Sequence, residues 1–141
     1  MRIVFAGLLL LSATVLSQDA NVLRRYRNFI ARHVGQVSRD RCDHEMGRRR
    51  LTKSSDSNLC RDTNTFIGDS AGRINLICGG AGAPYGGNFT RSLQPFPITI
   101  CNLKNENARQ PHCQYRGRAD TRYLVIQCEQ GYPVHFERDI V

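Results

Sequence analysis

Apolar side chains recur with a period near 3.6 in the first half of this chain and with a period near 2 in the second half. The first helical stretch carries apolar or inward-facing positions at Val22, Tyr26, Phe29, Ile30 and His33. Such spacing places all of them on one helix face. We predict a helix there, with Asn21 as its N-cap and Gly35 close to its end.

Two shorter helices are predicted further along. One extends from Arg39 to about Arg50 and turns Cys42 and Met46 inward. The other begins near Ser70 and ends at Cys78 before two glycines. The serine-rich stretch 54–58 between them is typical of a surface loop.

Strands are predicted near residues 97–102, 112–116, 122–129 and 134–136, where β-branched and aromatic residues alternate with polar ones. The glycine-rich segment Gly79–Asn88 lacks the strand and helix context of a phosphate-binding loop, and we interpret it as an exposed loop. Helices followed by antiparallel strands indicate an α+β fold. A length of 141 residues fits one domain.

The N-terminus is typical of a secretory signal peptide. Arg2 is followed by the apolar run Ile3–Leu11 and by a small residue, Ser17, so we expect cleavage before Gln18. The predicted organisation is a signal peptide over 1–17 and a single secreted domain over 18–141.

Six cysteines are present, all of them after residue 17. An even number in a small secreted chain indicates three disulfides, which could pair in 15 ways. Zinc binding is the alternative, but the closest pair, Cys101 and Cys113, is twelve residues apart and no C-x-x-C occurs. The spacing therefore favours disulfides, and no metal is expected.

The formal net charge is +8, and 18 of the 20 cations are arginine. Arginine binds phosphate oxygens in a bidentate manner, so the excess is typical of a protein that binds nucleic acid or another polyanion. A merely solvated basic surface is the other interpretation, and charge alone does not separate the two.

Of four histidines, His33 and His135 are the candidates for chemistry. His33 lies on the inward helix face, and His135 lies within an apolar segment near the C-terminus. Two histidines can serve as base and acid near neutral pH, and a nearby cation would suit transfer at a phosphodiester. His44 and His112 are expected at the surface and in a turn.

Several segments together resemble the pancreatic-type ribonuclease family. Cys60–Phe66 is similar to the signature Cys-Lys-x-x-Asn-Thr-Phe with one substitution, and Phe29–His33 and Pro133–Phe136 resemble the two catalytic histidine segments. Six cysteines, in place of eight, resemble the angiogenin branch. The resemblance spans residues 18–141 and implies three short helices packed on a bent antiparallel β-sheet. It also implies the disulfides Cys42–Cys101, Cys60–Cys113 and Cys78–Cys128.

The family's activity implies residue roles. His33 would be the general base, His135 the general acid and Arg61 the cation that stabilises the transition state. Arg32, Asn64, Thr65, Phe136 and Glu137 would bind substrate. The expected reaction cleaves single-stranded RNA or tRNA 3′ of pyrimidines to a 2′,3′-cyclic phosphate, with no cofactor.

Four departures from the family pattern bear on activity. Arg61 replaces a lysine, and a misplaced cation would lower the rate by roughly 10²–10³. Arg32 replaces a glutamine at the scissile phosphate. Glu137 replaces an aspartate, and we expect its extra methylene to loosen the contact with His135. Arg138 lies where angiogenins carry a glutamine that obstructs the pyrimidine pocket.

An alternative function is cell-surface, nuclear or membrane binding, as an angiogenic or host-defence protein. The run Arg48, Arg49 and Arg50 aligns with a nuclear-targeting and heparin-binding stretch, and Gly79–Asn88 would contact a cell-surface receptor. The arginine-rich surface would bind microbial membranes. Asn88 begins a glycosylation sequon. We expect a secreted monomer, with possible uptake into nuclei.

Overall fold

The computed structural model describes residues 19–141. The predicted signal peptide and its cleavage site lie outside these residues, so both stay predictions. Within residues 19–141 there is no helix of the length and apolar character that a membrane crossing requires.

The N-terminal helix forms where its periodicity predicts, and residues 19–33 are helical. The prediction of its N-cap is wrong, because Asn21 already lies inside the helix. The Asn21 side-chain oxygen instead accepts a hydrogen bond from Arg24 (2.8 Å). Val22, Phe29 and His33 are buried along one face, as the pattern requires.

The two later helices each combine α-helical and 3-10 turns. The first consists of η1 (Arg39–Arg41) and α2 (Cys42–Arg48), and the second of α3 (Ala71–Asn75) and η2 (Leu76–Cys78). The Ser70 hydroxyl caps α3 by accepting a hydrogen bond from the backbone N–H of Arg73. The predicted second and third helices are therefore confirmed.

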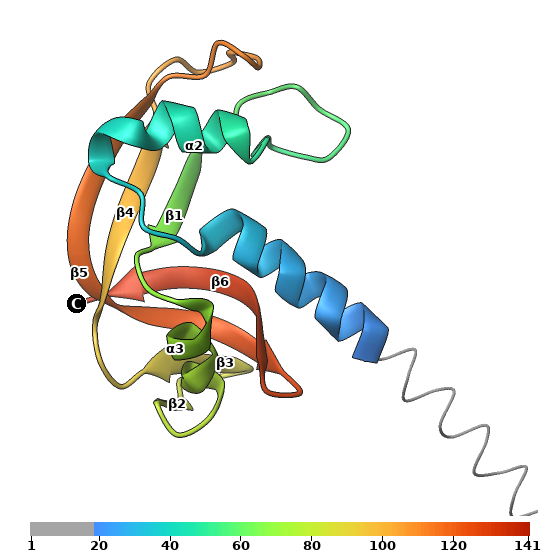
Figure 1. The fold of residues 1–141 in the computed structure, drawn as a ribbon, viewed down its shortest axis with the longest axis vertical. Helices are drawn as coiled ribbons and strands as arrows, with labels where there is room; N and C mark the ends of the chain where they lie inside the picture. The colour runs from blue at the N-terminus through green and yellow to red at the C-terminus, as the bar shows by residue number, and fades with distance from the viewer. Residues whose placement is uncertain (1–18) are drawn as a thin grey trace, which may run out of the picture.

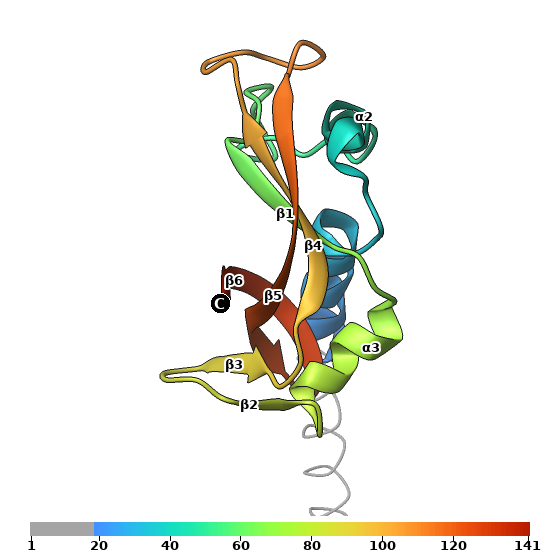
Figure 2. The same ribbon diagram turned by 90° about the vertical axis from the view of Figure 1, so that its left-hand side faces the viewer.

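Six antiparallel strands form one bent sheet. They are β1 (Thr63–Ile67), β2 (Gly82–Pro84), β3 (Phe89–Ser92), β4 (Phe96–Leu103), β5 (Tyr115–Glu129) and β6 (Tyr132–Ile140). The order is β1-β4-β5-β3-β2, with β6 paired to β5. Figure 1 shows β5 running the length of the molecule, and Figure 2 shows α2 and α3 on the same side of the strands.

The sheet bends because β5 changes partners along its length. Its first half, from Tyr115 to Arg122, pairs with β4, while its second half pairs with β3 and with β6. The strands predicted near 112–116 and 122–129 are thus one continuous strand that begins at Tyr115. The prediction of an exposed loop over Gly79–Asn88 is wrong in part, because β2 forms inside it and pairs with β3.

Two buried clusters fill the two arms of this bend. One contains Phe29 of the N-terminal helix, Ile74 of α3, Ile77 of η2, and residues of β4 and β5. The other contains Met46 of α2 and Phe66 of β1. The fold expected from the resemblance is therefore observed, with helices covering one face of a bent sheet.

Three disulfides tie the helices and loops to the strands. The bonds are Cys42–Cys101, Cys60–Cys113 and Cys78–Cys128, the pairing that the resemblance implies. They close segments of 50 to 59 residues. In a chain-entropy treatment each such bridge stabilises the fold by about 4 kcal/mol.

Candidate active site

His33 is positioned by the end of the N-terminal helix and by strand β1. Its Nδ1 lies 2.9 Å from the backbone carbonyl oxygen of Thr65, and the residue as a whole is 7% exposed. Its ring packs between Phe29 and Phe136, at centroid distances of 5.4 and 5.2 Å. Because a carbonyl oxygen only accepts, Nδ1 carries the proton and Nε2 of the neutral ring is free to take one.

Burial lowers the pKa of His33 from 6.5 to about 4. The hydrogen bond to Thr65 raises this pKa, and the charges of Arg61, Arg32 and His135 lower it. The three charged or chargeable side chains therefore lie close enough to His33 to act on its ring electrostatically. At neutral pH His33 is uncharged, which is the state that a general base requires.

His135 reaches the same region from β6. Its Nε2 donates to Oε2 of Glu137 (3.0 Å), two residues along the strand. The ladder between β5 and β6 shifts register at this point, since Ile126 faces Phe136 and Val125 faces Arg138. Glu137 therefore keeps a hydrogen bond to His135 despite its extra methylene, so the contact that was expected to loosen is still formed.

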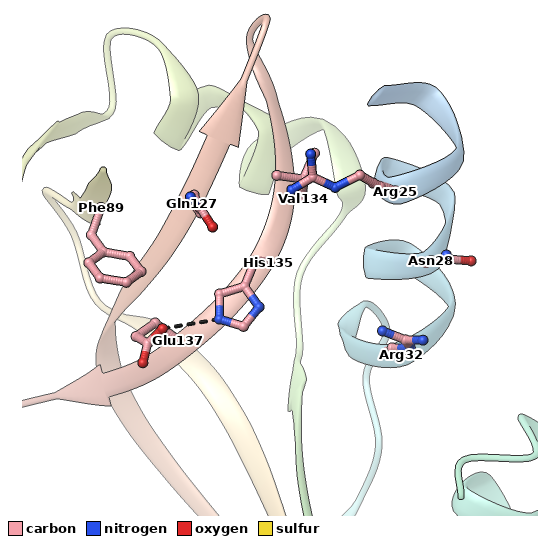
Figure 3. A pocket seen from close by; sticks show the side chains of 8 residues that line it. All are labelled: Arg25, Asn28, Arg32, Phe89, Gln127, Val134, His135 and Glu137. Atoms are coloured by element: carbon pink, nitrogen blue, oxygen red, sulfur yellow. Dashed lines mark hydrogen bonds and ion pairs between the residues drawn. The ribbon is translucent and has the colours of Figure 1, made fainter. Parts of the chain in front are cut away.

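A pocket of about 330 Å³ lies between β6 and the N-terminal helix. His135 and Glu137 line it on the strand side, and Arg32 lines it on the helix side. Figure 3 shows the second ring nitrogen of His135 on the side that faces the helix. An ion pair between Arg25 and Glu129 joins the helix to the end of β5 beside this pocket.

Strand β1 holds the remaining residues of the ribonuclease-like signature. Asn64 is buried, and its side-chain amide donates to the carbonyl oxygen of Arg32 (2.8 Å). Thr65 is also buried and holds His33 through its own carbonyl. The Tyr115 hydroxyl donates to the carbonyl oxygen of Arg61 (2.7 Å). Strand β1 therefore holds the helix that carries His33, and Arg61 just before this strand is bonded to β5.

Arg61 and Arg32 together supply positive charge beside His33. The Nε of Arg61 donates to the carbonyl oxygen of Thr63 (3.2 Å), and within residues 19–141 neither guanidinium forms an ion pair with a carboxylate. Burial and the charge of Arg32 lower the pKa of Arg61. Two guanidinium groups held close together without a counterion favour binding of an anion such as phosphate.

A second groove, of about 630 Å³, continues from this region along β1 and the segment after α2. Arg32 and Asn28 line both hollows, and Arg61, Arg50 and Lys53 line the second. Lys53 forms an ion pair with Asp62 (3.5 Å) and lies on the same groove as Arg61. The cationic surface is thus continuous with the pocket of His135.

Among the described residues no hydrogen bond joins Arg138 to Thr65. Its guanidinium carbon lies 5.8 Å from the ring centroid of Tyr85, which follows β2. Phe136, on the same strand, instead packs against the His33 ring. The side chain at the position that obstructs the pocket in angiogenins is therefore directed to the β2–β3 hairpin.

The predicted basic run Arg48–Arg50 is not a uniform solvated face. Arg48 and Arg50 are exposed, but the Arg49 side chain is only 13% exposed and is bonded to other elements. The two other histidines are at the surface, with His44 on α2 and His112 in a turn. Asn88 is exposed in the turn between β2 and β3.

Four residues of the pocket were not expected from the sequence: Arg25, Asn28, Phe89 and Gln127. Helical spacing from Arg32 could have identified the first two, since 25, 28 and 32 lie on one helix face. Phe89 and Gln127 carry no such signal, because they meet through the pairing of β3 with β5.

Comparison with known proteins agrees with this geometry. Residues 24–137 match the family model described as pancreatic ribonuclease. Angiogenin from Macaca mulatta is 40% identical over 121 residues, which cover 82% of this chain and 79% of that protein. Ribonuclease-like 3 from Danio rerio is 33% identical over 137 residues, 95% of this chain and 91% of that protein. The solved structure of RNASE ZF-1A matches with a TM-score of 0.80 and 46% identity, covering 86% of this chain and 96% of that one.

A buried histidine, an exposed histidine bonded to a carboxylate and an adjoining cationic groove suit an enzyme that cleaves RNA. The chain belongs to the pancreatic ribonuclease family and is a pancreatic-type endoribonuclease that acts on RNA. Its six cysteines and the identity to angiogenins match the angiogenin branch.

Proposed function

We propose that the protein cleaves single-stranded RNA, tRNA included, on the 3′ side of pyrimidines by transphosphorylation. His33 takes the proton of the ribose 2′-hydroxyl, and the resulting oxygen attacks phosphorus. The bond from phosphorus to the 5′-oxygen then breaks, and His135 gives that oxygen a proton. The products are a 2′,3′-cyclic phosphate and a free 5′-hydroxyl. Since the nucleophile is the 2′-hydroxyl, DNA would not be cleaved.

The observation that carries this proposal is the contact of His33 Nδ1 with the Thr65 carbonyl. It favours the tautomer in which Nε2 is the free base. The pKa of His33 near 4 also suits a slow enzyme, because a base whose pKa lies well below the working pH accepts a proton weakly. Weak, angiogenin-like activity is therefore expected.

Arg61 and Arg32 would neutralise the charge that develops on the phosphorane. Arg61 presents a delocalised guanidinium where the family pattern has a compact ammonium, so its stabilisation of the transition state would be smaller. Asn64 would support Arg32 indirectly, because its amide holds the carbonyl oxygen of that residue.

Pyrimidine recognition would fall to Thr65 and Phe136, which bracket the His33 ring from β1 and β6. The contact of Arg138 with Tyr85 supports an accessible base pocket, because that side chain is engaged away from Thr65. Dinucleotides with a purine on the 5′ side of the scissile phosphate would be cleaved more slowly than dinucleotides with a pyrimidine there.

The test is cleavage of a short RNA with a single pyrimidine by the disulfide-bonded protein and its His33→Ala and His135→Ala variants. We expect each variant to lose at least about 10²-fold in kcat/KM, the scale for one general acid or base. His44→Ala is the matched control, because His44 is exposed on α2. Activity unchanged in either catalytic variant would contradict the assignment.

We also propose where the protein is located and what it binds besides RNA. Three disulfides support secretion, since such bonds persist in oxidising compartments. The exposed Arg48 and Arg50 support binding to heparin-like polyanions or microbial membranes, and uptake into nuclei. The exposed β2–β3 turn supports a receptor contact and glycosylation at Asn88. A monomeric state is also proposed.

A further inference from the structure

Arg49 joins the end of the N-terminal helix to the rest of the domain. Its Nη1 donates to the carbonyl oxygens of Val34 (2.8 Å) and Ala31 (3.3 Å), which flank His33. The last carbonyls of a helix have no donor within the helix, and the helix dipole makes this end negative. The guanidinium therefore caps the helix at the turn that carries the base.

The same side chain is anchored on two other elements. Its Nε donates to Glu45 of α2 (2.8 Å), and both side chains are mostly buried. Its guanidinium carbon lies 4.9 Å from the ring centroid of Phe66, which is fully buried in β1. Phe66 directly follows Thr65, whose carbonyl holds the His33 ring.

The guanidinium of Arg49 packs closely against Gly35, in the segment that follows the N-terminal helix. A β-carbon at Gly35, where φ is +131°, would lie 2.7 Å from Nη2 of Arg49. The backbone N–H of Gly35 meanwhile donates to the carbonyl of Ile67 in β1. Arg49 thus contacts both supports of His33, the helix end and the strand.

We propose that Arg49 is a positioning residue for His33, which holds the helix end and β1 together so that the imidazole keeps its bond to Thr65. This inference rests on the proposed role of His33 as the base. Replacing all three arginines of the run Arg48–Arg50 would therefore impair RNA cleavage as well as any polyanion binding, so such a variant cannot separate the two functions.

The decisive comparison is between Arg49→Met and Arg48→Met. Both remove a partner of Glu45, but Arg48 is exposed and, within residues 19–141, bonds only to that carboxylate. At a temperature where both variants are folded, we expect Arg49→Met to lose about 10- to 100-fold in kcat with little change in KM. An ångström-scale displacement of a catalytic group has effects of this size. Arg48→Met should keep the parent kcat.

A second measurement follows the titration of the His33 ring by NMR, which does not depend on catalysis. In Arg49→Met the ring would gain solvent, and its pKa would rise from about 4 towards 6.5. A role confined to stability would lower the unfolding temperature and leave this pKa in place. The titration also separates the two proposals, since a parent protein that cleaves no RNA can still show the shift.

Arg49→Lys serves if the methionine variant does not fold. Lysine keeps the charge but cannot bond Glu45 and both carbonyls with one planar fork, so kcat should fall to an intermediate value. A folded Arg49→Lys or Arg49→Met protein with the parent kcat and the parent His33 titration would overturn the proposal.

Discussion

Replacing Arg32 by glutamine should move the acid limb of the pH–activity profile. The charge of Arg32 is one of the causes that lower the pKa of His33, after burial and the charge of Arg61. In the parent protein, kcat/KM should fall on acidification around pH 4, not around the ordinary histidine value of 6.5. In Arg32→Gln the limb should lie at a higher pH but still below 6.5, because burial and Arg61 remain.

The same depressed pKa predicts a loss of stability in acid. Between pH 6.5 and pH 4 the unfolded chain binds a proton at this histidine and the folded chain does not, so the free energy of unfolding falls as pH falls. Over the interval from 6.5 to about 4, at 1.36 kcal/mol per pH unit, the loss is about 3 kcal/mol. Above pH 6.5 this histidine is uncharged in both the folded and the unfolded chain, so it no longer makes the free energy of unfolding depend on pH.

The assay is kcat/KM from pH 3 to 8 on a short pyrimidine-containing RNA, together with urea unfolding at pH 7, 5.5 and 4. His33→Asn isolates the histidine contribution, since it removes the titrating group. Between pH 7 and pH 4 this variant should lose about 3 kcal/mol less of its free energy of unfolding than the parent protein does. Arg27→Gln is the matched control, because Arg27 is exposed on the same helix. An acid limb near 6.5 in the parent, or an equal shift in Arg27→Gln, would refute the reasoning.

Two further predictions test positioning and packing. Glu137→Gln should lower kcat by about 10-fold, because the carboxylate that orients His135 is lost, and thermal unfolding should be little changed. A β-carbon at Gly117 would lie 1.9 Å from the carbonyl oxygen of Arg39, so Gly117→Ala should destabilise the fold by about 2 kcal/mol or more. Gly47→Ala is its counterpart, since no atom lies within 4 Å there, and urea unfolding should show a gain of about 0.5–1 kcal/mol. Equal effects at the two glycines would contradict the packing argument.

Arg50 illustrates a feature of the helix end that sequence patterns do not indicate. Its φ is +54°, in the left-handed region that favours glycine. The N–H of Leu51 bonds the carbonyl of Met46, and the N–H of Arg50 bonds that of Gly47, which is a Schellman motif. An arginine at this position costs about 1–2 kcal/mol relative to glycine. The side chain lines the cationic groove, where its charge adds to that of Arg61 and Arg32.

Local elements with a strong period could be predicted from the sequence. The inward face of the N-terminal helix, the buried Cys42 and Met46 of α2, and the Ser70 cap of α3 all follow from side-chain spacing and capping chemistry. The inward position of His33 could also be predicted from the sequence, because it depends only on helical geometry.

Elements that exist through pairing could not be predicted from local patterns. Strand β2 has three residues within a glycine-rich segment, and it forms because β3 lies beside it. The continuity of β5 depends on β4 along one half and on β3 and β6 along the other. Strand formation is decided by neighbours distant in the chain, so short strands carry little signal of their own.

Side-chain spacing, composition and motifs were enough to predict the helices, the cysteine set, the cationic excess and the ribonuclease family. The folded chain was needed to bring the segment of His135 against His33, because the two come from opposite ends of the chain and meet through the packing of Phe136 on the His33 ring. It also separated Arg49 from Arg48 and Arg50, which are chemically identical in the sequence. Burial, hydrogen bonding and charge at a residue are set by what packs around it, and that environment is assembled from all parts of the chain.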